Sequence, residues 1–458
     1  MSVITLPTAV RRTACLVPLL GTLVVAATCH GQFGGGFGNQ AVGGIAVDAE
    51  GIVRSLEPQA LESLAFERTR ALADAGWSGK QAASRTVSLK AVAAAVKESA
   101  AGSTPLSAEV QFLGGLQRIE RVFVDPDGHD ILLSGPCDRL AVDGSGAIVG
   151  AASHRPPLHL EDFIVCLRAI DAARAGGMTC SIDPAPEGIA RLQAVLRRQG
   201  SMGDPKATFA AMEQALGPQK ISVSGVPTDS RFARVLVAAD YRMKRIGMGL
   251  EESGIKGLPS YLAMIPAGGR STALPRFWLE ADYDPIARDP DELAWRIGGR
   301  RMKCLTESDV VAQKQDGMKR GAAPADPIAQ KWCTAMTGSY DDLATRQPVF
   351  AELVNCIDLA VVAALIKGRQ LDGRAGCDLG PLTDPAGLAL PSYDVPASVP
   401  TVATGQRKGT SWVLSASGGV KFQPWQFAAN TAEEPDLAAS RTTALAGRPA
   451  TLNGCSWD

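Results

Sequence analysis

Helix and strand patterns alternate through residues 161–251, and this alternation constrains the fold more than any other feature of the chain. The apolar residues recur at helical spacing in some segments and at strand spacing in others. Such alternation predicts a mixed sheet covered by helices, so the expected fold class is α+β. The predicted elements are helices 161–175, 187–199, 205–216 and 230–251, with strands 178–182 and 220–226.

Turn residues predict β-hairpins before this segment. Further helices and strands are predicted on both sides of it. Residues 43–53 and 140–149 carry similar strand, turn and strand phrases, and residues 121–133 turn through Asp-Pro-Asp-Gly. The other predicted elements are helices 58–75, 89–100, 327–336 and 348–367, strands 277–283 and 293–305 with a bulge or turn at Gly298-Gly299, and a last strand pair near 412–414 and 420–422.

These patterns suggest five consecutive parts. Both ends are rich in Gly or Pro and are expected to be flexible. The parts are a signal peptide (1–31), a Gly-rich leader (32–42), an N-terminal hairpin and helix unit (43–160), a central α+β unit with the buried helix 348–367 (161–370), and a Pro/Gly-rich linker with a short C-terminal strand pair (371–458).

The first residues are typical of an export signal that is removed. Arg11 and Arg12 precede the apolar run 14–27, and small residues follow it. We expect cleavage near Gly31, with an acylated Cys29 as the alternative, and ordinary secretion rather than the twin-arginine route. The mature chain is then a periplasmic, cell-envelope or secreted protein with no membrane span, because the apolar segment 356–366 is too short to cross a bilayer.

Net charge limits the partners that are expected, and the cysteines indicate which disulfides are possible. The net charge is −1 at pH 7, and removal of residues 1–31 makes it slightly more negative, so no nucleic-acid partner is predicted. Export permits disulfides among the eight remaining cysteines. Cys166 and Cys356 lie in apolar helical patterns and are expected to be buried thiols, whereas Cys377 and Cys455 lie beside Gly and are the better candidates for a bridge.

Helix 230–251 carries an arginine stripe beside its apolar face. Four guanidinium groups on one flank repel each other unless anions neutralise them. Carboxylates from neighbouring elements are one explanation, and a bound carboxylate, sulfate or phosphate is the other. The stripe therefore defines a candidate anion-binding site: Arg231, Arg234, Arg242 and Arg245.

Three aspartates are the candidate catalytic acids. Asp358 is the only ionisable residue in the apolar segment 356–366, so it is expected to be protonated, paired with an arginine or directed into a cleft. Asp183 and Asp229 stand where strand patterns pass into helices; they fit helix caps, although ligands also gather at such strand ends.

No motif for a cofactor, metal or nucleophile is present. The sequence lacks a nucleophile elbow, a phosphate loop, a His-Glu-x-x-His helix and a Cys-x-x-Cys pair. The three histidines that remain after export, at 129, 154 and 159, lie in turn-like or Pro-rich sequence. We therefore predict no cofactor and no metal.

Five short phrases occur in order along the chain. They begin at Gly43 (Gly-Gly-Ile-Ala-Val-Asp), Gly115 (Gly-Leu-Gln-Arg-Ile), Ser181 (Ser-Ile-Asp-Pro), Gly225 (Gly-Val-Pro-Thr-Asp-Ser) and Asp240 (Asp-Tyr-Arg-Met-Lys). Together they resemble a family of secreted planctomycete proteins catalogued as domain of unknown function 1598. The resemblance implies export and assigns no activity, cofactor or catalytic residue.

The sequence is compatible with two functions. The first is a non-catalytic binding or assembly role in the cell envelope, with an unknown envelope component or an anionic small molecule as partner. The second is a hydrolase or transferase that uses acidic residues on an anionic substrate outside the cytoplasm. The second requires a cleft that joins the aspartates to the arginine stripe.

Overall fold

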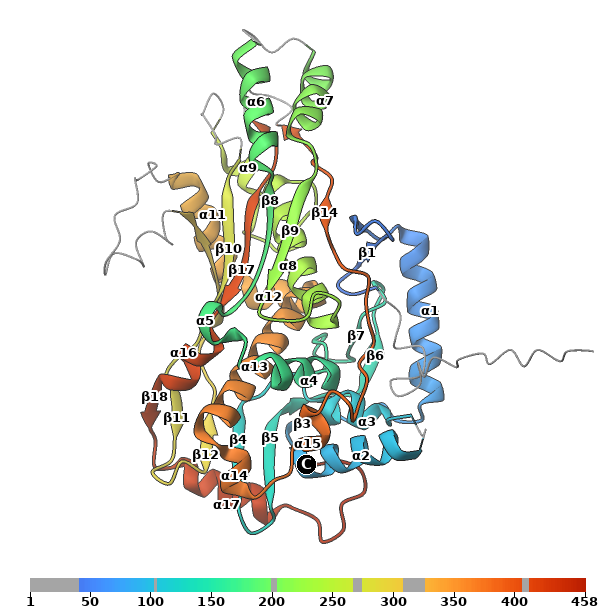
Figure 1. Ribbon diagram of the computed structural model, residues 1–458, viewed down its shortest axis with the longest axis vertical. Coiled ribbons are helices and arrows are strands. Elements are labelled where there is room, and N and C mark those ends of the chain that lie inside the picture. Colours follow the sequence, from blue (N-terminus) through green and yellow to red (C-terminus); the bar gives the residue numbers. More distant parts are fainter. Residues whose placement is uncertain (1–40, 103–104, 199–203, 267–273, 308–325, 406–411) are drawn as a thin grey trace, which may run out of the picture.

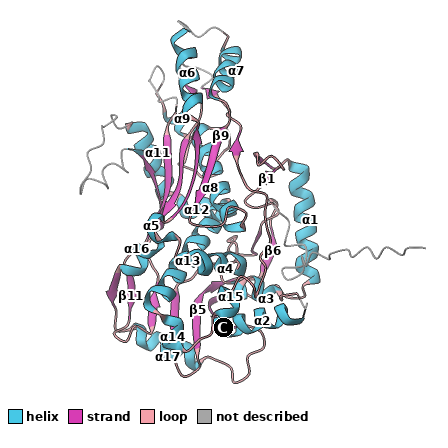
Figure 2. Ribbon diagram, in the orientation of Figure 1, coloured by secondary structure: helices cyan, strands magenta, loops and turns pink. Residues whose placement is uncertain are grey.

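The computed structural model describes residues 41–102, 105–198, 204–266, 274–307, 326–405 and 412–458; the signal and nearly all of the Gly-rich leader lie outside them. The described residues form an α+β fold in which two large mixed sheets pack against helices (Figures 1 and 2), as the sequence predicts. Helices and strands are interleaved along the chain, and the sheets take strands from distant segments.

The first sheet has six strands in the order β13-β10-β17-β8-β9-β14. Every neighbouring pair is antiparallel except β10 with β17. Helix α8 packs against β8 and β17, and helix α11 packs against β13. The strands are β13 (Arg301–Thr306), β10 (Arg276–Asp282), β17 (Ser417–Phe422), β8 (Met178–Pro184), β9 (Gln219–Ser224) and β14 (Ser398–Val399), and the helices are α8 (Arg231–Met248) and α11 (Pro327–Gly338).

The second sheet has seven strands in the order β18-β11-β12-β4-β5-β3-β19. Only β18 and β11 run parallel. The strands are β18 (Thr431–Glu433), β11 (Ile286–Arg288), β12 (Ala294–Arg296), β4 (Arg121–Asp125), β5 (Asp130–Cys137), β3 (Ala82–Ser88) and β19 (Ser456–Trp457).

The sheets correct two sequence predictions. The expected strand 293–305 is two strands, because the chain leaves β12 in one sheet, turns at Gly299 with φ of +103°, and enters β13 in the other. The expected C-terminal strand pair does not form, since β17 pairs with β10 and β8 instead. Residues 371–458 therefore supply strands to both large sheets and do not form a separate linker.

Two short hairpins share the same turn chemistry. In β1–β2 (Ile45–Val47, Val53–Ser55), the Asp48 carboxylate accepts hydrogen bonds from the backbone of Glu50 and Ile52. In β6–β7 (Leu140–Val142, Ile148–Gly150), Asp143 accepts from the backbone of Ser145 and Ala147. An Asp side chain that bonds the backbone ahead of it fixes this kind of turn, so both predicted hairpins are confirmed.

Helix α13 (Pro348–Arg369) is the core helix of the fold and lies between the two sheets (Figure 1). The whole helix is 22 residues long and apolar enough by length and composition to cross a membrane, although its apolar segment 356–366 alone is too short. Its most apolar window is 94% buried inside the fold, as expected of a core helix. Burial, rather than length, therefore distinguishes α13 from a membrane-spanning helix.

The remaining described elements are mostly helices. They are helices α1 (Pro58–Asp74), α2 (Leu89–Gly102), α3 (Ala108–Gln111), α4 (Leu160–Ala169), α5 (Ala173–Gly176), α6 (Pro186–Arg198), α7 (Pro205–Leu216), α9 (Tyr261–Met264), α12 (Tyr340–Arg346), α14 (Leu371–Ala375), α15 (Gly380–Thr383), α16 (Pro424–Ala429) and α17 (Leu437–Ala446), the 3-10 turn η1 (Leu113–Gly115), and strands β15 (Thr404–Gly405) and β16 (Trp412–Val413).

All eight cysteines of the described residues are buried, and none forms a disulfide in the structure. This agrees with the prediction for Cys166 and Cys356 and contradicts the bridge expected for Cys377 and Cys455. Those two are held by different elements: the backbone of Cys455 donates to Glu109, and that of Cys377 donates to Asp372.

Candidate functional site

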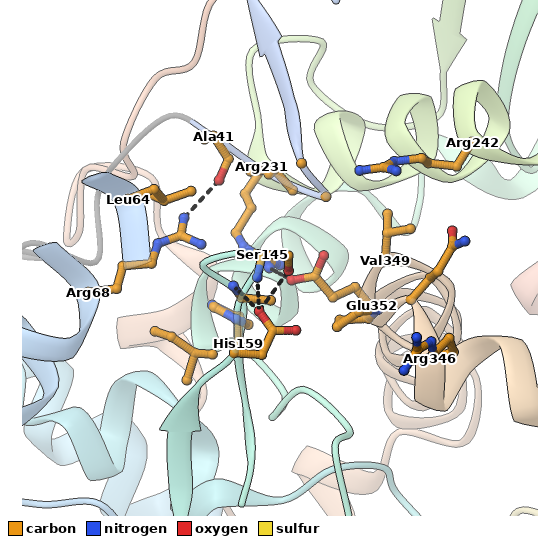
Figure 3. A pocket seen from close by; sticks show the side chains of 18 of the residues that line it. Ala41, Leu64, Arg68, Ser145, His159, Arg231, Arg242, Arg346, Val349 and Glu352 are labelled. Carbon is orange, nitrogen blue, oxygen red and sulfur yellow. Dashed lines mark hydrogen bonds and ion pairs between the residues drawn. The ribbon is translucent and has the colours of Figure 1, made fainter. Parts of the chain in front are cut away.

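A cavity of about 190 Å³ lies where the N-terminal hairpin meets helices α8 and α13 (Figure 3). Its walls come from parts of the chain that are far apart in sequence. They include the residues before β1, helix α1, the β6–β7 turn, the start of α4, helix α8 and the first turn of α13. This volume is smaller than that of pockets that hold drug-sized ligands, which are roughly 300–1,000 Å³.

Two glycines let the hairpin close tightly over this cavity. Gly43 and Gly44 have φ of +61° and +71°, a region that favours glycine. A Cβ atom on Gly43 would lie 2.6 Å from side-chain atoms of both Ala238 and Val349, and one on Gly44 would meet the guanidinium of Arg242. The phrase Gly43-Gly44 therefore has a steric reason, which is the close approach of the backbone to α8 and α13.

Arg231 is the central cation of the cavity wall. It is 7% exposed and forms ion pairs with Asp162 and Glu352, the latter at 2.5 Å. Burial alone would lower the pKa of Arg231, but Asp162 and Glu352 together raise it. Ser230 caps the helix one residue earlier, because its hydroxyl accepts from the Ala233 backbone at 3.1 Å. Arg231 is thus a fixed, permanently charged group.

Two carboxyl groups next to Arg231 have raised pKa values. Burial raises the pKa of Glu161 to about 8, and the neighbouring Asp162 adds to this rise. Burial also raises the pKa of Asp162, while Arg231 partly offsets the effect. The Tyr393 hydroxyl lies 3.2 Å from Glu161 Oε2. At neutral pH Glu161 is therefore mostly neutral, and it does not cancel the charge of the arginines in front of it.

Three more arginines line the cavity (Figure 3). Arg68 on α1 donates to the carbonyl oxygens of Gly146 and Ala41 at 2.8 and 2.7 Å. Arg242, further along α8, pairs with Glu251. Arg346 is exposed at the end of α12 and forms no ion pair within the described part of the chain. These groups come from three different elements and face the same space.

His159 supplies a neutral ring to the same cavity. It stands immediately before α4, and its ring packs edge-on against Phe112 with centroids 5.2 Å apart. Burial lowers the pKa of His159 well below its usual value, and the nearby Arg231 and Arg68 lower it further. A neutral imidazole can donate or accept a hydrogen bond at pH 7 without adding charge.

The charged side chains that line the cavity carry a positive excess. Four arginines face three carboxylates, which are Asp143, Glu251 and Glu352. Asp143 is already engaged by the β6–β7 turn, where its carboxylate accepts hydrogen bonds from the backbone. Fixed guanidinium groups from several elements, together with a neutral imidazole, are suited to hold an anion by charge-assisted hydrogen bonds.

The structure separates the predicted arginine stripe into two kinds of residue. Arg231 and Arg242 line the cavity. Arg234 is fully buried, with its Nε atom 2.9 Å from the Asp394 carbonyl and its guanidinium over the Tyr393 ring. Arg245 pairs with Glu251 at 3.4 Å. Arg234 and Arg245 do not line the cavity but hold the C-terminal segment and the end of α8 in place.

The three candidate acids do not line the cavity, and each has a local role. Asp358 is fully buried and is bound by Arg301, by the Tyr283 hydroxyl at 2.5 Å and by a backbone amide. Asp183 accepts from the Gly418 backbone at 3.1 Å, between strands β8 and β17. Asp229 lies 3.0 Å from the Ser392 hydroxyl. The cleft that an acidic hydrolase would need is therefore not built from these residues.

Helix α8 also buries a second ion pair away from the cavity. Lys244 Nζ donates to Asp240 at 2.9 Å and to the carbonyl oxygens of Ile182 and Gly418. Burial raises the pKa of Asp240 to about 7, against the opposing effect of Lys244. This lysine fastens α8 to strands β8 and β17.

No metal site is apparent in the described ranges. Within them, no three His, Cys, Asp or Glu side chains are grouped closely enough to hold a metal ion. The cavity's own donors are guanidinium groups, which repel cations, so its chemistry favours anions.

Comparison with known proteins finds a similarity to one family in part of the chain. Residues 180–261 match the profile of a family described as "Protein of unknown function (DUF1598)". No curated protein and no solved structure matches the chain. The matched stretch contains β9, all of α8 and most of β8, so it includes Arg231 and Arg242 but none of the cavity walls from the N-terminal hairpin or α13. This part of the chain is similar to a family whose description assigns no activity.

Proposed function

We propose that the protein binds a small anionic molecule in the cavity between the N-terminal hairpin and helices α8 and α13, without catalysing its conversion. One observation carries this proposal: Arg68, Arg231, Arg242 and Arg346, from three separate elements, line one cavity in excess of its carboxylates. A ligand with a carboxylate, sulfate or phosphate group would accept charge-assisted hydrogen bonds from these guanidinium groups.

The size and shape of the cavity restrict the ligand. With about 190 Å³, the site accommodates an anion of a few heavy atoms rather than a polymer, unless part of the ligand remains outside. Arg346 is exposed at the end of α12, so it would meet the ligand at the solvent side, and Arg231 would meet it at the buried side.

The proposed setting is outside the cytoplasm. Residues 1–31 have the pattern of an export signal, and the five family phrases resemble secreted planctomycete proteins. The proposed role is therefore that of an exported cell-envelope protein that recognises an anionic small molecule or an anionic group of another envelope component.

A thermal-shift screen tests the proposal. The mature chain is titrated with acetate, succinate, sulfate, phosphate and glucuronate, with chloride at equal ionic strength as the reference. A ligand at 100 times its Kd stabilises the folded state by about 2.7 kcal/mol. We expect one of these anions to raise the Tm of the wild type and not that of Arg242→Ala.

Arg245→Ala is the matched control for Arg242→Ala. Both arginines lie on α8 and form an ion pair with Glu251, which follows the helix, but only Arg242 lines the cavity. A retained anion response in Arg245→Ala, together with its loss in Arg242→Ala, supports the site. Equal responses in all three proteins, or no response to any anion, would refute the proposal.

A further inference from the structure

Cys304 and Cys333 bring two sulfur atoms together in the interior of the fold. Cys304 lies on β13 and Cys333 on α11, and their Sγ atoms are 3.4 Å apart. The residues are 3% and 0% exposed. We propose that these two cysteines are joined by a disulfide bond when the protein folds under oxidising conditions.

Hydrogen bonds hold strand β13 against helix α11 beside the two cysteines. The Thr337 hydroxyl of α11 accepts from the Cys304 backbone amide at 2.9 Å and lies 3.4 Å from the Cys304 carbonyl. Cys304 also pairs with Leu279 in the antiparallel ladder between β13 and β10. The two sulfur atoms are 3.4 Å apart, and a disulfide bond brings them to about 2.0 Å.

Four of the other buried thiols have a different arrangement. Cys166 Sγ is directed to the Cys356 carbonyl at 4.0 Å, and Cys356 Sγ lies 3.8 Å from the Asp162 carboxylate. Cys137 and Cys455 likewise contact backbone carbonyl oxygens. Each of these sulfur atoms has an oxygen neighbour, so the pair on β13 and α11 is distinguished by its sulfur-to-sulfur contact.

Thiol–disulfide exchange supplies a balanced route to the bond. A thiolate of the pair attacks one sulfur of a donor disulfide, such as oxidised glutathione, and releases one donor thiol. The second cysteine then attacks the mixed disulfide and releases the other donor thiol. The cysteine pair loses two hydrogens and is oxidised, while the donor disulfide is reduced.

The bond would fasten α11 to the edge of the six-stranded sheet. It joins the two ends of the segment 305–332, and a cross-link that closes a loop of this size restricts the unfolded chain. Because the thiols are buried in the folded state, the oxidised form should form mainly during folding and then resist reduction.

Peptide mapping of the full mature chain tests this inference. The protein is unfolded in reductant and refolded in parallel with reduced glutathione alone or with a mixture of reduced and oxidised glutathione. Remaining thiols are alkylated in denaturant before digestion without reductant. We expect the mixture to yield a cross-linked peptide pair containing Cys304 and Cys333, lighter by two hydrogens than the two separate peptides, and a Tm about 5 °C higher than that of the reduced protein.

Two variants serve as controls. Cys304→Ala removes the pair, so its Tm should no longer depend on the glutathione mixture and Cys333 should be alkylated. Cys180→Ala removes a buried thiol on β8 and should keep both the cross-link and the redox-dependent Tm. Alkylation of both Cys304 and Cys333 in the oxidised wild type, or their linkage to other cysteines, would overturn the proposal. The wild-type map gives this answer even if a variant fails to fold.

Discussion

Among the described residues, the buried arginine–carboxylate clusters of Arg301 with Asp358 and of Arg231 with Asp162 differ in what surrounds them. In the cluster of Arg301 and Asp358, both carboxylate oxygens have partners, since Tyr283 binds Oδ1 and the Ile119 amide binds Oδ2 together with Arg301. In the cluster of Arg231 and Asp162, the Asp162 Oδ1 atom has no hydrogen-bond partner among the described residues.

This difference shows that a buried charged residue does not by itself indicate a binding site. The Arg301 guanidinium also donates to the carbonyl oxygens of Ile119 and Ile297, so that cluster is closed on all sides. Arg231 stands instead on the wall of a cavity that it shares with Arg68, Arg242 and Arg346. We therefore assign a structural role to the first cluster and propose a binding role for the second.

The largest expected effect comes from breaking the closed cluster. Asp358→Ala leaves Arg301 buried without its carboxylate and should lower the free energy of unfolding by about 4 kcal/mol. Urea unfolding measures this loss. The double variant Arg301→Met/Asp358→Leu should recover most of it, because neither charge remains buried. If Asp358→Ala folds with unchanged stability but loses anion binding, the assignment of roles is reversed.

Breaking the cluster at the cavity should affect both stability and binding. Arg231→Met leaves Asp162 and Glu352 without their shared cation, and we expect a loss of about 3 kcal/mol in the free energy of unfolding. The same variant should show no Tm rise with the anion that stabilises the wild type. A normal anion response in a folded Arg231→Met protein would contradict the binding role.

The pH dependence of stability tests the neutral state of Glu161. Its folded pKa of about 8 lies above its usual value of 4.5, so the proton is held more tightly in the folded state. The resulting stability is fully present below pH 4.5 and is lost as pH rises through 8. Relative to Glu161→Gln, the wild type should lose about 2 kcal/mol between pH 5.5 and 7, at 1.36 kcal/mol per pH unit.

Parallel urea titrations of the two proteins across this pH range give the comparison. Glu161→Gln keeps the shape of the protonated side chain, so the two stability curves should converge toward low pH. Curves that run parallel from pH 5.5 to 7 would show that Glu161 is ionised in the folded protein.

Arg346→Ala should have the smallest effect on stability and the most selective effect on binding. The side chain is exposed and forms no ion pair with the described residues, so the free energy of unfolding should change by less than about 0.5 kcal/mol. Loss of one charge-assisted hydrogen bond should weaken anion binding about tenfold. Calorimetric titration with the anion found by thermal shift measures this change, and an unaltered Kd would remove Arg346 from the site.

Local signals predicted individual elements well. Helix α7 begins and ends where the sequence indicates, because Asp204 accepts from the Lys206 backbone, Pro205 occupies the first turn and Gly217 follows the last residue with φ of +71°. The hairpins β1–β2 and β6–β7 were predictable for the same reason, since a single Asp side chain fixes each turn.

Pairing between distant segments could not be predicted from such signals. Val420 and Phe422 have a strand pattern, but nothing local indicates that β17 inserts between β10 and β8. The lining of the cavity could not be predicted for the same reason, because Arg68 and His159 come close to the arginines of α8 only when the chain folds. The one available signal was the adjacent pair of acids at residues 161–162, at the start of an apolar helix, where buried carboxylates require a nearby cation.

The position of β17 also has a consequence for the order of events during synthesis. This strand comes from residues 417–422, yet it occupies the interior of the six-stranded sheet. A nascent chain that has emerged only as far as α13 must keep β10 and β8 apart, with their facing edges open to wrong partners. The sheet can close only after nearly the whole polypeptide is available, so we expect slow folding and a need for protection from aggregation until that moment.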